Sequence, residues 1–368
     1  MAKFAALILA AGYGSRMGRF KPLLHLGGKS AVEWALTAFR DAGVADVAVV
    51  TGYGATDLEA ELHRLGVAAL RNPNYDHGMY SSIQVGIAAL APDVGACFLL
   101  PVDIPLVRAA TIAALAATHA AAPAAVTYPV FQGQRGHPPL IRRDLFAEIL
   151  AGDGEGGLRA LLLRHEAAEV AVADESILLD MDAPDDYQRL SLRALRRHLP
   201  TEAECEAILE LEGVGEPIRR HGRAVAAVAR NLARHLDNLD PGLPVAASLL
   251  HDVAKGQPDH AAAGASIVTR HGYPAVAEAV RQHMDFDFSD GRIDAAAIVF
   301  IADKLVREDH RVELASRFQP AFERFAGQPE ALAGARRKYE NARRVLEAIE
   351  DRAGMAHADM LRDCGVPE

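Results

Sequence analysis

An apolar run over residues 4–11, followed at once by a glycine-rich turn, most limits the fold of this chain. The run is too short for a buried helix, but it suits a central strand of a parallel sheet, which is covered on both faces. The turn frees the backbone to point amide groups toward an anion, and two cations add positive charge. Its glycines and cations are Gly12, Gly14, Gly18, Arg16 and Lys21. The stretch therefore predicts a strand that ends in a loop for the phosphates of a nucleoside triphosphate.

The composition favours a soluble protein of two domains. With 368 residues, 50% of them apolar, the chain can build two separate cores. A net charge of −10 argues against nucleic acid as a partner, so a bound phosphate must meet a small basic pocket or a metal. Three scattered cysteines indicate a reducing compartment, and we expect a cytoplasmic protein. No run approaches the ~20 apolar residues of a membrane span, so no membrane partner is expected.

The pattern of apolar residues changes along the chain. In the first half, strand candidates alternate with amphipathic helical stretches, which is typical of a parallel sheet covered by helices. The later strand candidates are 47–51, 67–70, 97–101, 124–128 and 169–172. From Thr201, a predicted helix cap, nearly every segment has helical spacing, and the tail over 329–349 predicts a solvated helix. We therefore expect a Rossmann-like α/β domain over residues 1–195 and an all-α domain over 196–368.

Carboxylates at two places suggest a metal site in the first domain. Asp103 follows the strand candidate at 97–101, and ligands bind at this edge of parallel sheets. Asp182 lies just before a proline-started helix and is the favoured second ligand, with Asp180 as the alternative. Asp185 and Asp186 are better explained as acidic residues in the first turn of that helix. It is also open whether the acids of this stretch serve only as helix-start residues.

Two polar loops complete the first candidate site. Gly78, Ser81 and Ser82 enter a predicted helix; the hydroxyls would serve either as helix caps or as donors to a base or ribose. His137 follows Gly136 in a proline-fixed turn, where a structural role and a substrate contact are both open.

Five motifs over about residues 4–190 resemble the cytidylyltransferase branch of the MobA-like molybdenum cofactor nucleotidyltransferases. They are Leu9-Ala-Ala-Gly-x-x-x-Arg-Met-Gly-x-x-Lys, Gly78-Met-x-Ser-Ser-Ile, Pro101-Val-Asp-x-Pro-Leu, Gly136-His-Pro and Asp180-x-Asp-x-Pro-x-Asp-Tyr. The resemblance implies that the glycine loop with Arg16 and Lys21 holds the triphosphate. It further implies that Asp103 and Asp182 hold Mg²⁺, and that Ser81, Ser82 and His137 face the nucleotide or the pterin.

The same resemblance suggests the reaction. A molybdopterin-type phosphate would attack the α-phosphorus of CTP, with Mg²⁺ and Lys21 absorbing the negative charge and pyrophosphate leaving. The pair Ala10 and Ala11 favours CTP, because guanylyl-transferring relatives tend to have a second glycine there. The finished cofactor could pass to a molybdenum enzyme. A sugar phosphate as the acceptor is the alternative.

A second cluster of possible metal ligands lies in the helical half. His221, His251, Asp252 and Asp303 each fall on or beside an apolar helix face. Burying unpaired carboxylates is costly, so acids and imidazoles that converge there are best explained by a shared cation. Mixed nitrogen and oxygen ligands suit Fe, Mn, Zn or Mg.

This set resembles the HD metal-dependent phosphohydrolases over about residues 217–310. The matching motifs are Leu249-Leu-His-Asp-Val-Ala-Lys-Gly, Asp259-His-Ala-Ala-Ala-Gly-Ala, Ala279-Val-Arg-Gln-His-Met and Ile298-Val-Phe-Ile-Ala-Asp-Lys. The resemblance implies that His221, His251, Asp252 and Asp303 bind a first metal, and that His260 and His283 bind a second. It further implies that Lys255 contacts a phosphate and that a metal-activated water is the nucleophile. A ligand-sensing or docking module is the alternative to a hydrolase.

Overall fold

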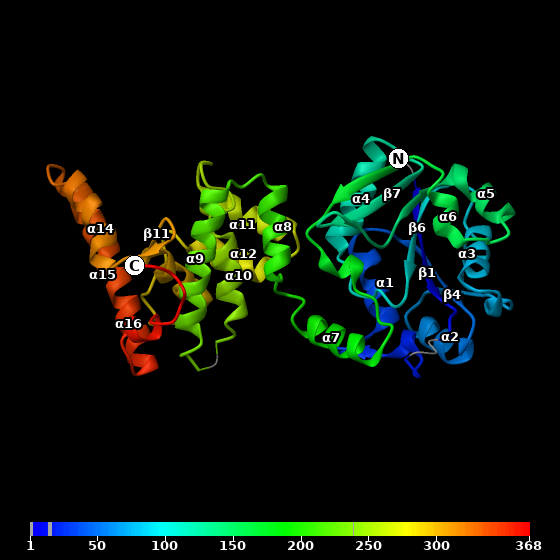
Figure 1. The fold of residues 1–368 in the computed structure, drawn as a ribbon, viewed down its shortest axis with the longest axis horizontal. Coiled ribbons are helices and arrows are strands. Elements are labelled where there is room, and N and C mark those ends of the chain that lie inside the picture. Colours follow the sequence, from blue (N-terminus) through cyan, green and yellow to red (C-terminus); the bar gives the residue numbers. More distant parts are fainter. Residues whose placement is uncertain (1–2, 14–16, 238) are drawn as a thin grey trace. The chain divides into compact units, whose positions relative to one another are not determined.

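The computed structural model describes residues 3–13, 17–237 and 239–368. The chain divides into two compact units, Met1–Arg197 and His198–Glu368 (Figure 1). The division falls close to the expected boundary near residue 195. Each unit has its own secondary structure class, and each contains one of the two predicted clusters. Among the described residues, no helix combines the length and the apolar character that a membrane span needs.

The first unit is built on a mostly parallel sheet, as the sequence predicts. Its strand order is β10-β7-β9-β6-β1-β4-β5, with β8 paired to β7. The strands are β1 (Lys3–Ala10), β4 (Asp46–Thr51), β5 (Ala68–Arg71), β6 (Val94–Pro101), β7 (Val126–Phe131), β8 (Gln134–Arg135), β9 (Leu140–Arg142) and β10 (Ala167–Ala171), besides a small hairpin of β2 (His25–Leu26) and β3 (Lys29–Ser30). Central β1 pairs in parallel with both neighbours, so that Leu7 lies opposite Ala48 and Leu99. The short β9 runs antiparallel between β6 and β7, which the sequence did not predict.

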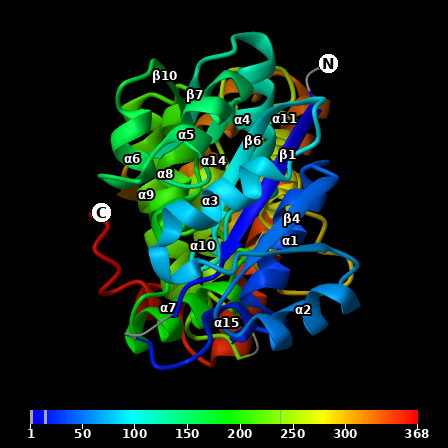
Figure 2. The same ribbon diagram turned by 90° about the vertical axis from the view of Figure 1, so that its right-hand side faces the viewer.

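Helices cover both faces of this sheet because β1 is apolar on both faces. On one face lie α1 (Ala31–Asp41) and α4 (Ala109–Ala121), and Phe39 of α1 packs against Phe98 of β6. On the other lie α3 (Met79–Ala88), α5 (Phe146–Ala151) and α6 (Gly157–Leu162), as Figures 1 and 2 show. The remaining helices of this unit are α2 (Ala55–Arg64) and α7 (Pro184–Leu195). The layers leave the carboxyl edge of the strands for loops.

The second unit is helical, also as predicted. Its helices are α8 (Glu202–Leu211), α9 (Glu216–Ala233), α10 (Gly242–Leu250), α11 (His260–Arg270), α12 (Pro274–Gln282), α13 (Ala295–Lys304), α14 (Leu314–Arg324), α15 (Pro329–Ala353) and α16 (His357–Met360). A small hairpin of β11 (Val306–Arg307) and β12 (His310–Arg311) follows α13. The predicted cap is confirmed, since Thr201 Oγ1 accepts from Glu204 N and Glu204 Oε2 accepts from Thr201 N. Helix α10 contacts α8, α9, α12 and α13 and so lies at the centre of the bundle.

We expect Leu7→Ala to destabilise the first unit by about 2–5 kcal/mol, because it removes a fully buried side chain from the central strand. Leu192→Ala on α7 is the matched control, since Leu192 is 65% exposed, and its change should stay within about 0.5 kcal/mol. Chemical denaturation followed by circular dichroism measures both. Equal effects of the two substitutions would contradict the assignment of β1 to the core.

Two candidate functional sites

Lys21 bridges two carboxylates that come from distant parts of the chain. It begins the short 3-10 turn η1 (Lys21–Leu23), whereas Asp103 follows β6 and Asp182 precedes α7. The Lys21 Nζ atom donates to Asp182 Oδ1 at 2.7 Å and to Asp103 Oδ2 at 3.3 Å. The structure therefore brings a predicted phosphate-binding cation and both predicted Mg²⁺ ligands to one place at the carboxyl edge of the sheet.

The charges at this place suit a cation. Burial by itself lowers the pKa of Lys21, but the hydrogen bond to Asp182 and the charge of Asp103 outweigh burial and raise that pKa. The pKa of Asp180 is also raised, first by burial and then by the neighbouring charges of Asp182 and Asp103. Carboxylate oxygens are ligands that Mg²⁺ prefers, and they repel one another unless positive charge lies between them. Asp103 and Asp182, which both pair with Lys21, therefore fit a divalent cation beside that lysine.

Asp186 supports the site from the start of α7. Its Oδ2 atom accepts from Ala183 N at 2.8 Å and from Asp182 N at 3.2 Å. The carboxylate thus satisfies amide groups at the helix start, the role that the sequence suggested for it, and it also fixes the backbone of Asp182.

Asn72 organises the serine loop, a role that the sequence analysis missed. The buried Asn72 Nδ2 donates to both Ser81 Oγ and Ser82 Oγ at 2.9 Å, and its Oδ1 accepts from Asn74 N. Ser81 Oγ also donates within the loop, to the carbonyl oxygens of Asn74 and Gly78. These hydroxyls thus hold the entry to α3. The available signal was an asparagine before a proline at the end of a strand, which favours a side-chain turn.

Small residues shape the loops around the site. Ala10 and Ala11 are buried at the end of β1, whereas a Cβ added at Gly12 would meet open space. Gly18 and Gly78 have φ of +63° and +92°, which L side chains rarely adopt. Gly14 and Arg16 lie outside the described residues.

His137 lies beside the carboxylates in a tightly packed turn. A Cβ at Gly136 would come within 2.6 Å of the Ile177 carbonyl oxygen, so glycine is needed there, and His137 N donates to that same oxygen. Burial lowers the pKa of His137, while the charge of Asp103 opposes this. Its Nδ1 atom is buried without a hydrogen-bond partner among the described residues. The ring is therefore a neutral imidazole whose buried Nδ1 atom is unused.

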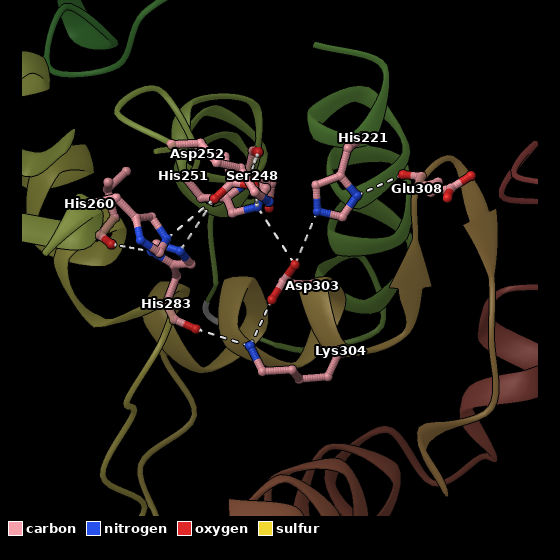
Figure 3. A network of polar contacts seen from close by, with 11 residues as sticks. His221, Ser248, His251, Asp252, His260, His283, Asp303, Lys304 and Glu308 are labelled. Atoms are coloured by element: carbon pink, nitrogen blue, oxygen red, sulfur yellow. Dashed lines mark hydrogen bonds and ion pairs between the residues drawn. The ribbon is translucent and has the colours of Figure 1, made fainter. Parts of the chain in front are cut away.

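The second cluster is assembled from five helices. Its members are His221 on α9, His251 and Asp252 at the end of α10, His260 at the start of α11, His283 after α12 and Asp303 on α13. Figure 3 shows these side chains pointing toward one another. They form two overlapping groups of ligand atoms, each within 4.8 Å: one has His221 and His251, the other His260 and His283, and Asp252 belongs to both. The structure therefore brings together all six predicted ligands, with Asp303 contacting two of the imidazoles.

Imidazoles in this cluster direct Nε2, the nitrogen that carries no hydrogen in the neutral ring described below, toward carboxylates. The Nδ1 atoms of His251 and His283 each contact a backbone carbonyl oxygen at 2.7 Å, that of Ser248 and of Val280. A carbonyl oxygen only accepts, so Nδ1 carries the hydrogen and Nε2 of the neutral ring is left with a lone pair. His221 is held in the same way by the carbonyl oxygen of Glu308, a second residue that the sequence analysis missed.

The distances in the cluster suit a shared metal. The Nε2 atom of His221 lies 3.1 Å from Asp303 Oδ1, and that of His251 lies 3.4 Å from Asp252 Oδ2. Ligands bound to one metal at about 2.1 Å are themselves about 3.0–3.4 Å apart. The Nε2 atoms of His251 and His283 are buried and have no hydrogen-bond partner within the described part of the chain. Lone pairs that face one another in this way require positive charge between them, and a divalent cation supplies it.

The pKa values of these groups show how strongly the cluster attracts positive charge. Burial alone lowers the pKa of His251, but contacts with Asp252 and Asp303 outweigh it and raise that pKa to about 10. Burial and the charge of His251 lower the pKa of His283 to about 4. Burial favours a raised pKa for Asp303, yet the charge of Lys304 and the bond to His221 hold it well below its usual range. The two acids therefore favour positive charge beside His251, which a bound metal would also supply.

Two lysines pair with the acidic ligands. Lys255 Nζ lies 2.5 Å from Asp252 Oδ2, and its side chain is half exposed. Lys304 Nζ, on a partly buried side chain, donates to Asp303 Oδ2 at 2.7 Å and to the His283 carbonyl oxygen at 3.4 Å. Lys304 therefore fixes Asp303, whereas the Lys255 side chain is open to solvent. The motif that carries Asp303 includes Lys304, but no spacing rule indicated its role.

These folds and sites define a nucleotidyltransferase unit followed by a helical metal-binding unit, and known sequences agree. Residues 6–170 match the MobA-like NTP transferase domain, and residues 218–308 match the HD domain. The chain belongs to the MobA-like NTP transferases and carries an HD domain after the transferase domain. Domains of both kinds are generally dependent on divalent metals.

Individual relatives differ in the substrates that their names give. The molybdenum cofactor cytidylyltransferase of Escherichia coli is 25% identical over 195 residues, which cover 51% of this chain and 95% of that protein. The phosphoenolpyruvate guanylyltransferase of Rubrobacter xylanophilus is 30% identical over 189 residues, which cover 51% of this chain and 88% of that protein. The bifunctional protein GlmU of Trichlorobacter lovleyi is 32% identical over 172 residues, covering 46% of this chain but 35% of its own length.

We expect His251→Ala to weaken Mn²⁺ binding to the second unit by about 100-fold or more, because it removes a buried ligand that faces both acids. The matched control is His310→Ala, since the His310 side chain is 53% exposed and lies outside the cluster. Equilibrium dialysis with metal analysis measures binding, and the rise in melting temperature on adding Mn²⁺ provides a second readout. Undiminished binding by the His251 variant would contradict the assignment.

Proposed function

We propose that the first unit transfers the cytidylyl group of CTP to a molybdopterin-type acceptor and releases pyrophosphate. The observation that carries the proposal is the convergence of Lys21, Asp103 and Asp182 at the carboxyl edge of the sheet. Similarity to the molybdenum cofactor cytidylyltransferase of Escherichia coli supports the acceptor class. The buried pair of Ala10 and Ala11 before the glycine loop supports CTP.

The side chains divide the work of this reaction. Asp103 and Asp182 would hold Mg²⁺, which when bound shields the charge of the phosphates and so lowers the barrier to attack by another anion. Lys21 is oriented by the same two carboxylates, so its ammonium group is already aimed at the phosphates before they arrive. His137, whose pKa responds to the charge of Asp103, is the candidate contact for the acceptor. In this proposal no side chain acts as a nucleophile.

For the second unit we propose metal-dependent hydrolysis of a phosphoester. The cluster supports this, because Asp252 joins two groups of imidazole ligands and Lys255 stands ready beside it as a phosphate contact. Bound metal would lower the pKa of a water and so provide the nucleophile. His221, His251 and His283 are held by backbone carbonyl oxygens, so the chain keeps their lone pairs directed at the metal without reorganisation.

We expect Lys21→Met to reduce nucleotidyl transfer by about 100-fold or more, because one charge-stabilising donor is lost from the transition state. Transfer is measured as pyrophosphate release with each of the four nucleoside triphosphates and, in turn, molybdopterin, phosphoenolpyruvate and sugar phosphates as acceptors. Lys3→Met is the control, since Lys3 pairs with Asp46 and Asp93 at the opposite end of β1. A preference for GTP over CTP would contradict the assignment of the base. Activity with sugar phosphates alone would show that the acceptor is a sugar phosphate rather than molybdopterin.

We expect Asp252→Asn to abolish hydrolysis of phosphoesters and nucleotides by the full chain with Mn²⁺ or Fe²⁺, because the ligand common to both groups loses its charge. Nucleotidyl transfer by the same variant should be unchanged. Asp290→Asn, at an exposed side chain, is the control for hydrolysis. If the wild-type protein binds nucleotides at this cluster without turnover, the second unit is a sensing or docking module rather than a hydrolase.

A further inference from the structure

Three tyrosines from three separate loops meet at the carboxyl edge of the sheet. Tyr13 follows β1, Tyr53 follows β4, and Tyr75 lies in the 3-10 turn η2 (Tyr75–His77) before α3. The ring centroid of Tyr13 lies 5.0 Å from that of Tyr53 and 5.4 Å from that of Tyr75. The cluster is nevertheless open, since Tyr13 is 51% exposed and Tyr53 is 44% exposed. Large aromatic rings in contact are usually buried, so an open cluster suggests a binding surface.

Packing against the backbone holds the rings in place. A Cβ at Gly52 would lie 2.6 Å from Tyr75 Cβ, so glycine lets Tyr75 pack directly on the loop after β4. A Cβ at Gly54 would lie 2.9 Å from the ring of Phe20, which in turn packs against Tyr53. The Tyr53 amide donates to the carbonyl oxygen of Ala11, which ties this loop to the end of β1. The positions of the rings are therefore set before any ligand binds.

The position of the cluster indicates what it binds. In the sheet, β4 and β5 lie on one side of β1, and β6, which leads to Asp103, lies on the other. Tyr13 follows Gly12 of the phosphate loop directly, and Phe20 precedes Lys21. A nucleoside triphosphate has a highly charged end and a flat apolar end. With its phosphates at Lys21, its flat end suits the aromatic side of β1, away from the carboxylates.

We propose that Tyr13, Tyr53 and Tyr75 form a stacking surface for the base of the nucleoside triphosphate. The inference rests on the proposed nucleotidyl transfer. Stacking on tyrosine does not discriminate among bases, because every base has an aromatic face. The surface therefore supplies affinity for the base, while the choice of CTP depends on hydrogen bonds elsewhere in the site.

The test compares the binding of Mg-CTP with that of Mg-tripolyphosphate, which has the phosphates and no base. For Tyr53→Ala we expect the Kd of Mg-CTP to rise about ten-fold or more, while the Kd of tripolyphosphate stays within two-fold. Tyr53→Phe keeps the ring and should bind Mg-CTP within two-fold of the wild type. Tyr13→Ala is expected to behave like Tyr53→Ala. Isothermal titration of the full chain measures all of these constants.

Three outcomes would overturn the inference. If the wild-type protein binds Mg-CTP no better than tripolyphosphate, the base makes no contribution, although nucleotidyl transfer could still stand. If Tyr53→Ala leaves Mg-CTP binding unchanged and raises only the KM of the acceptor, the rings serve the acceptor instead. If the wild-type protein binds neither Mg-CTP nor tripolyphosphate, the proposed transfer fails as well. Circular dichroism of each variant shows whether the fold is retained.

Discussion

Both sites depend on one constraint, the repulsion between lone pairs or negative charges that face one another. In the second unit, backbone carbonyl oxygens hold the Nδ1 hydrogens of the imidazoles, so the bare Nε2 atoms face carboxylate oxygens. In the first unit, Asp103 and Asp182 converge on one lysine. The groups of the second site are buried, which costs several kcal/mol for each charge without compensation, so that site must contain positive charge. Lys21 supplies it in the first site, and a divalent metal would supply it in the second.

The edge of a parallel sheet gathers groups of different chemistry in the first unit. All parallel strands present their carboxyl ends to this edge, so each loop contributes one kind of group. Gly12 follows β1, Asp103 follows β6, and Tyr53 follows β4. Because β1 lies between β6 and β4, charged and apolar groups are separated across the site. Asn72 then fixes the serine loop beside the aromatic side, which keeps the arrangement rigid.

The sequence predicted the main elements well and their long-range contacts poorly. Every strand expected in the first half is present, and the runs over β1 and β6 are apolar because these central strands are buried on both faces. The short β9 was missed, since its residues follow two prolines and give no periodic signal. Five of the six predicted ligands of the second site lie in four motifs, and His221 was found from its position on an apolar helix face. The sequence analysis missed the roles of Glu308, Lys304 and Asn72. Glu308 acts through its carbonyl oxygen, Lys304 through an ion pair and Asn72 through a buried amide, and none of these produces a regular spacing in the sequence.

The sequence by itself determined that a sheet with a glycine loop comes first, that helices follow, and that acids and imidazoles lie on apolar helix faces. These are local properties, because neighbouring residues in one element decide them. Only the tertiary structure decided that Lys21 meets Asp182, which is 161 positions away, and that three tyrosines share one surface. Such contacts depend on strand order and loop closure. These contacts arise from the free energy of the whole fold, so no short stretch of the chain predicts them.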